Sequence, residues 1–138
     1  MGTRTAWRVP VTLSVLVVLA GCSTIATFNQ RALENATDLK AYALILMDHA
    51  AEDADKYSED IDYLELRLWQ AYEYAAAIPK NEESAQQWEI LKDPERDLLG
   101  GFLRDWKDGP LLPFLITEKK KQISAAFDEI IRLEKAKL

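Results

Sequence analysis

The stretch 58–78, SEDIDYLELRLWQAYEYAAAI, carries the strongest indication of the fold. Its apolar residues recur at alternating three- and four-residue steps, at Ile61, Leu64, Leu68, Ala71, Ala75 and Ile78. This spacing places them on one face of an α-helix. Ser58 followed by two acidic residues favours a helix start, and Pro79 favours a helix end. We therefore predict an amphipathic helix over about 59–78 that buries this face.

Helical patterns continue on both sides of this stretch. Upstream, apolar residues at helical spacing predict one long helix over about 24–55, and its segment 41–47, AYALILM, is apolar on every side, which indicates a central position. Downstream, the pattern predicts helices over about 82–92, over 94–107, and from between 113 and 117 to near 137. The expected fold class is all-α. The architecture is an antiparallel bundle of three long helices with a short helical pair between the second and the third.

The segment around Gly100-Gly101 is unusual because two adjacent glycines cost a helix about 1 kcal/mol each relative to alanine. Either another helix approaches closely there, or the helix breaks and exposes a groove. Large apolar side chains surround the pair in the sequence, and the functional hypothesis is that they line a groove for a partner helix or an acyl chain. The candidate groove residues are Trp88, Leu99, Gly100, Gly101, Phe102, Trp106 and Phe114. The alternative is that these residues pack in the core.

The beginning of the chain has the pattern of an export signal. Arg4 and Arg8 precede an apolar run, VPVTLSVLVVLA over 9–20. A helix of this run is too short to cross a hydrocarbon core of about 30 Å, so the run is typical of a cleavable signal. It ends in LAGC at 19–22, which resembles the lipobox of bacterial lipoproteins. The resemblance implies that Cys22 receives a diacylglycerol and becomes the first residue after cleavage.

This resemblance sets the expected domains and location. Residues 1–21 are the predicted signal peptide, and 22–138 form a single helical domain on a membrane anchor facing the periplasm. Ser23, in place of aspartate, resembles the pattern of lipoproteins sent to the outer membrane. Cys22 is the only cysteine, so an internal disulfide is excluded. Several acyl chains would give stable anchoring.

Charge narrows the classes of partner. The chain has 17 Lys+Arg and 23 Asp+Glu. Without Arg4 and Arg8 the mature part keeps 15 basic and 23 acidic residues, a net charge of about −8. Such a surface repels nucleic-acid phosphates and anionic lipid headgroups, so no nucleic-acid partner is expected. Acids dominate the stretch 48–65, which indicates a docking face for a basic partner, loose binding of divalent cations, or a solvated corner between helices.

Motifs for catalysis and metal binding are missing from the sequence. His49 is the single histidine, and with Glu52 and Asp53 it makes at most a weak ligand set. There is no nucleophile elbow and no glycine-rich phosphate loop. We therefore expect neither a metal nor a cofactor beyond the lipid on Cys22, and no enzymatic activity. The favoured hypothesis is a membrane-anchored binding or assembly factor for an envelope protein, comparable in role to the pilotins of secretins. The alternatives are a binder of a small apolar ligand such as an acyl chain, and a carboxylate-dependent cell-wall hydrolase.

Overall fold

The computed structural model describes Gly2 and residues 24–138. The described residues form helices and loops and contain no strand. The elements in chain order are α1 (Gln30–Met47), the 3-10 helix η1 (Ala54–Tyr57), α2 (Ser58–Ala77), α3 (Glu82–Lys92), α4 (Leu99–Asp108) and α5 (Pro113–Lys135). The predicted all-α antiparallel bundle is confirmed. No helix in this part of the chain combines the length and the apolar character needed to span a membrane.

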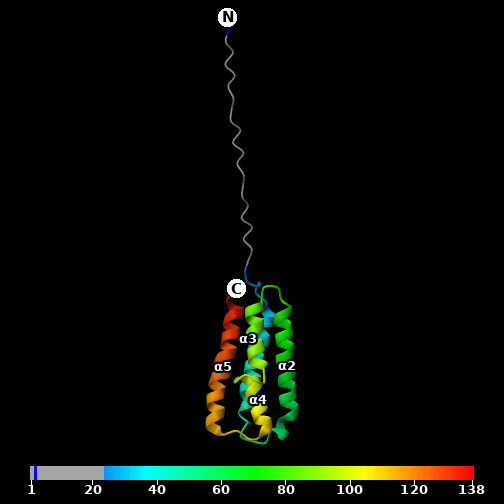
Figure 1. Cartoon of the computed structure of the whole chain (residues 1–138), viewed down its shortest axis with the longest axis vertical. Coiled ribbons are helices and arrows are strands. Elements are labelled where there is room, and N and C mark those ends of the chain that lie inside the picture. The colour runs from blue at the N-terminus through cyan, green and yellow to red at the C-terminus, as the bar shows by residue number, and fades with distance from the viewer. Residues whose placement is uncertain (1, 3–23) are drawn as a thin grey trace.

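The helices form four parallel columns (Figure 1). Helix α1 runs away from the end of the bundle where residues 24–29 lie, and α2 returns to that end. Helices α3 and α4 then follow each other along the third column, and α5 returns along the fourth. Helices α1 and α3 each pack against both α2 and α5. The short helical pair therefore takes the place of the fourth helix of a bundle, because its two members are joined end to end.

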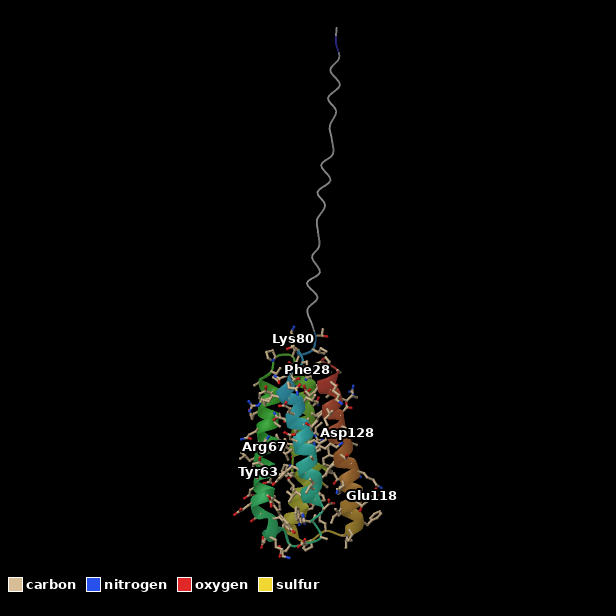
Figure 2. All side chains as sticks on the ribbon, turned by 180° about the vertical axis from the view of Figure 1, so that it is seen from behind. Phe28, Tyr63, Arg67, Lys80, Glu118 and Asp128 are labelled. Carbon is tan, nitrogen blue, oxygen red and sulfur yellow. The ribbon has the colours of Figure 1, made fainter. Side chains whose placement is uncertain are left out.

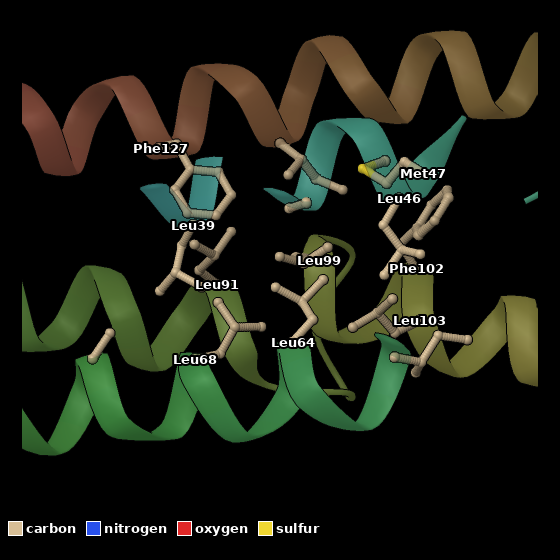
Figure 3. Packing of buried hydrophobic residues seen from close by; sticks show 14 of the residues in the cluster. Leu39, Leu46, Met47, Leu64, Leu68, Leu91, Leu99, Phe102, Leu103 and Phe127 are labelled. Atoms are coloured by element: carbon tan, nitrogen blue, oxygen red, sulfur yellow. The ribbon is translucent and has the colours of Figure 1, made fainter. Parts of the chain in front are cut away.

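The core lies between these columns (Figure 3). Five of the six residues that define the stripe of α2 are fully buried, and the sixth, Ile78, is half-buried at the end of the helix. Leu64 and Leu68 face Leu91, Leu99 and Leu103 of the third column. Burial of a leucine side chain contributes about 1.5–3 kcal/mol, so this stripe is a main source of stability.

Helix α1 is shorter than the predicted range 24–55. It begins after Asn29, whose side-chain oxygen accepts a hydrogen bond from the Ala32 backbone N–H at 3.1 Å. Residues 24–28 before Asn29 are not helical, and the Ala26 N–H donates to the Lys80 carbonyl at 3.0 Å. This hydrogen bond joins residues 24–29, which we call the strap, to the turn between α2 and α3. Apolar spacing alone did not reveal where α1 begins, because Phe28 continues the spacing but lies in the strap before the helix.

The other end of α1 also departs from the prediction. The helix ends at Met47, and a turn leads to η1, where the Asp53 carboxylate accepts from the Asp55 N–H at 3.1 Å. The expectation that segment 41–47 is central on every side is wrong, since Ile45 is 65 % exposed. Ala43 and Met47 of the same segment are fully buried. An outer helix of a four-column bundle always keeps one face in solvent.

Candidate functional sites

Six of the seven candidate groove residues lie in the interior. Trp88, Leu99, Phe102 and Trp106 are buried among the core residues, as are the two glycines between them. The Trp88 ring packs edge-on against Phe127 with centroids 6.0 Å apart, and Trp106 Nε1–H donates to the Glu52 carbonyl at 2.9 Å. These contacts correspond to the core-packing alternative. Buried side chains are not available to a partner while the bundle stays folded.

The two glycines serve a close backbone approach. Helix α4 begins at Leu99 and not near 94, because the Asp93 carboxylate accepts from the Glu95 N–H at 2.9 Å and closes a turn before the helix. A Cβ atom on Gly100 would lie well inside 3.0 Å of the Lys92 carbonyl oxygen, and one on Gly101 would meet the Arg96 carbonyl oxygen similarly. The absence of a side chain therefore allows α4 to fold back onto the turn after α3.

Phe114 is the exception among the candidate residues, because it is 78 % exposed. Leu112 beside it is 74 % exposed, and Leu115 is 37 % exposed. We call these three residues the apolar tip. They lie where α5 begins, at the end of the bundle opposite to the strap (Figure 1).

The apolar tip is held in a fixed conformation. Pro113 is the first residue of α5, and the Leu111 N–H donates to the Ala50 carbonyl at 2.8 Å. Proline restricts the backbone, and this hydrogen bond ties the loop to the turn after α1. A segment that is already ordered loses less conformational entropy on binding. The tip is therefore suited to insertion into an apolar socket.

Carboxylates surround this end of the bundle. Each lysine of η1, α4 and the first half of α5 lies in an ion pair, with Lys56–Glu52, Lys107–Glu65, Lys119–Asp97, Lys120–Asp48 and Lys121–Glu118 as the pairs. Asp53, Asp55 and Asp108 make no ion pair with the described residues. A cleft of about 350 Å³ at this end is lined by Asp55 and Asp62 together with Lys107, which pairs with Glu65. The end that carries the apolar tip is therefore negative.

His49 belongs to a hydrogen-bonded cluster near this end. Its ring stacks on Tyr57 with centroids 4.7 Å apart, and Tyr57 Oη lies 3.0 Å from His49 Nδ1. The hydroxyl donates to Glu52 at 2.8 Å, which lowers the pKa of Glu52 and raises the pKa of Tyr57. No group of three or more His, Cys, Asp or Glu side chains within the described ranges is placed to hold a metal ion.

A side groove marks the break between α3 and α4. It measures about 280 Å³, and its lining includes Gly100 and Leu103 beside Leu66 and Trp69 of α2. Trp69 is 53 % exposed, and the Lys92 ammonium lies 3.7 Å from its ring centroid. The helix does not break at the glycine pair, which lies inside α4, and α2 provides the exposed aromatic residue of this groove. Cys22 lies outside the described residues, so the lipid attachment stays a prediction.

Comparison with known proteins adds no relative. The chain matches no family model, no curated protein and no solved structure. The proposals below therefore depend on the residues of this chain alone.

Proposed function

We propose that the chain is a lipid-anchored, non-enzymatic docking factor that holds an envelope protein through its apolar tip. The single observation that carries the proposal is the exposure of Leu112, Phe114 and Leu115 together where α5 begins. An exposed apolar group with a polar rim is typical of a protein interaction site.

The two ends of the bundle suit two different roles, membrane attachment at one end and contact with a partner at the other. Thr24, the first residue of the strap, lies two residues after the predicted lipidated Cys22, at the end opposite to the apolar tip. Helix α5 has 23 residues, which corresponds to a length of about 34 Å. The strap end of the bundle would therefore face the bilayer, while the apolar tip reaches a partner in the periplasm.

Charge favours a protein with a basic rim as the partner. Asp53, Asp55 and Asp108 are exposed at the tip end, and the anionic headgroups of a second bilayer would be repelled by them. Lysine or arginine side chains on a partner would instead be attracted, which raises the association rate. Apolar contact at Phe114 would then supply most of the affinity.

Photo-crosslinking in the bacterium that makes the protein tests this proposal. A benzophenone amino acid replaces Phe114, and a matched variant carries it at Ile45, which is also apolar and exposed but lies on the side of α1. We expect one discrete protein adduct from position 114 that disappears when Leu112→Asp is added, and none from position 45. Adducts of equal yield from both positions, or adducts with lipid only, would contradict the proposal. The second of these outcomes would favour the alternative of an apolar-ligand binder.

A further inference from the structure

We propose that the cleft between α1 and α2 is a binding site for a phosphate-type anion. The cleft measures about 500 Å³ and is lined by Arg31, Asn35, Arg67, Gln70, Ala71 and Tyr74. Figure 2 shows Arg67 above Tyr63 on α2, beside α1. The site lies on the side of the bundle and shares no residue with the apolar tip or the side groove.

The two arginines of the cleft differ from the other arginines in the described part of the chain. Three others bind carboxylates, in the pairs Arg96–Asp93, Arg104–Asp105 and Arg132–Glu129. Arg31 and Arg67 form no ion pair with a described residue, although the chain has 23 acidic residues against 17 basic ones. In such a chain a carboxylate partner is readily available to an exposed arginine. That the two unpaired arginines share one cleft indicates a site kept open for an external anion.

The lining of the cleft is also distinctive. No carboxylate is part of it, whereas the four other described clefts each include at least one, with Glu82, Glu65, Glu83 and Asp55 as examples in turn. The amide groups of Asn35 and Gln70 add N–H donors to the lining. An anion would therefore meet donors and positive charge without a competing carboxylate in the lining.

Aromatic rings hold both guanidinium groups. The Arg31 guanidinium lies 5.3 Å from the centroid of Tyr74, whose hydroxyl donates to the Asn29 side chain at 3.1 Å. Asn29 also caps α1, so the ring beneath Arg31 is fixed to the start of that helix. Arg67 donates from Nη1 to the hydroxyl of Tyr63 at 2.9 Å and lies 5.8 Å from its ring centroid.

These contacts leave most of the arginine donors for a ligand. A guanidinium has five N–H donors in a planar fork that matches the oxygens of a phosphate. The hydrogen bonds of the described residues use a single donor of Arg67, on a neutral oxygen, and none of Arg31. Stacking on tyrosine restricts the long side chains without neutralising their charge. A phosphate monoester or diester is the class of ligand that fits this arrangement best.

Two sources could supply this phosphate. Arg31 follows the predicted lipid attachment at Cys22 by nine residues and lies in the first turn of α1, at the strap end of the bundle. Headgroups of the anchoring bilayer are therefore one source, and this source rests on the proposed anchoring. A soluble phosphorylated molecule is the other, and it requires no anchor.

Titration with inorganic phosphate tests the site itself. The probe is the ¹⁵N-labelled full chain in maltoside micelles, which contain no phosphate, and sodium chloride at equal ionic strength is the reference. We expect saturable shifts of the side-chain amide signals of Asn35 and Gln70. Arg31→Gln or Arg67→Gln should weaken binding about tenfold or more, because each removes charge-assisted hydrogen bonds. Arg132→Gln removes the same charge from an arginine that is ion-paired with Glu129, and it should leave the affinity unchanged.

A second arm identifies the source of the phosphate. The same signals are followed with the full chain in nanodiscs of phosphatidylcholine, with and without phosphatidylglycerol. Shifts that depend on phosphatidylglycerol and on both arginines assign the site to a headgroup, and shifts with inorganic phosphate alone assign it to a soluble molecule. If neither probe shifts the Asn35 and Gln70 amides, or if the Arg31→Gln/Arg67→Gln variant responds like the parent, the anion site does not exist. Neither result bears on the apolar tip, so the docking proposal is tested separately.

Discussion

Replacing Gly100 by alanine tests the reason for the glycine pair, because two effects predict opposite signs. Alanine is the better helix former by about 1 kcal/mol, so helix propensity alone predicts a more stable protein. Against this, the new Cβ would lie inside 3.0 Å of three backbone atoms of Lys92 and Asp93. Backbone atoms have no alternative rotamer, so α4 or the turn after α3 has to move.

The size of the effect follows from these two terms. Overpacking of a close contact costs about 1–3 kcal/mol, and a clash with three backbone atoms belongs at the upper end of this range. After the gain of about 1 kcal/mol in propensity, we expect Gly100→Ala to lower the free energy of unfolding by about 2 kcal/mol. For a domain of this size the midpoint of thermal unfolding should then fall by roughly 8 °C.

Chemical and thermal unfolding followed by circular dichroism measure this difference. Ala125→Gly provides the reference, because Ala125 is exposed in the middle of α5 and its replacement changes helix propensity without changing a buried contact. That variant should lose about 1 kcal/mol. A Gly100→Ala protein as stable as the parent, or more stable, would show that α4 does not approach the turn after α3 this closely.

Three further predictions concern other parts of the chain. Cys22→Ala should abolish labelling of the protein by radioactive palmitate and block its processing by the lipoprotein signal peptidase, whereas persistent labelling would exclude the lipobox. Lys137→Met should cost about 3 kcal/mol of stability in urea unfolding, because it leaves Glu134, which is 1 % exposed, without its ion-pair partner at 2.8 Å. Adding Glu134→Gln should recover part of this loss, and no recovery would mean that packing and not charge causes it. Burial and then the hydrogen bond to Asp60 raise the pKa of Tyr42 to about 12. Its contribution to stability should therefore be complete below pH 10 and lost between pH 10 and 12. Ultraviolet titration should show a tyrosine that ionises near pH 12 and is missing from Tyr42→Phe.

The structure divides the acidic stretch 48–65 into residues that form ion pairs within the described part of the chain and residues that do not. Part of this charge is paired within the chain, since Asp48 pairs with Lys120 of α5 and Glu65 pairs with Lys107 of α4. Such exposed pairs contribute little stability. Asp53 and Asp55 remain in solvent at the end that carries the apolar tip. They are the part of the stretch that suits a basic partner.

The sequence predicted a helix correctly where its apolar spacing and its end residues lie within a few residues of each other. The stripe of α2 emerged as predicted, and α3 has the predicted bounds, because periodicity and proline act over a few residues. Both ends of α1 were misplaced because the apolar spacing continues in the sequence beyond the ends of the helix. Asn29 and Asp53 form caps there that interrupt a periodicity which continues in the sequence. The resemblance to the lipobox is likewise a local pattern, and it alone supports the prediction for Cys22.

Only the tertiary structure decided which apolar and charged residues remain at the surface. Trp106 and Phe114 belong to one apolar region of the sequence, yet the first is buried beneath η1 and the second projects from the end of the bundle. Arg31 and Arg67 are 36 residues apart and line one cleft because α1 and α2 pack antiparallel. No spacing rule within a single helix contains that information, since it arises from the register between two helices.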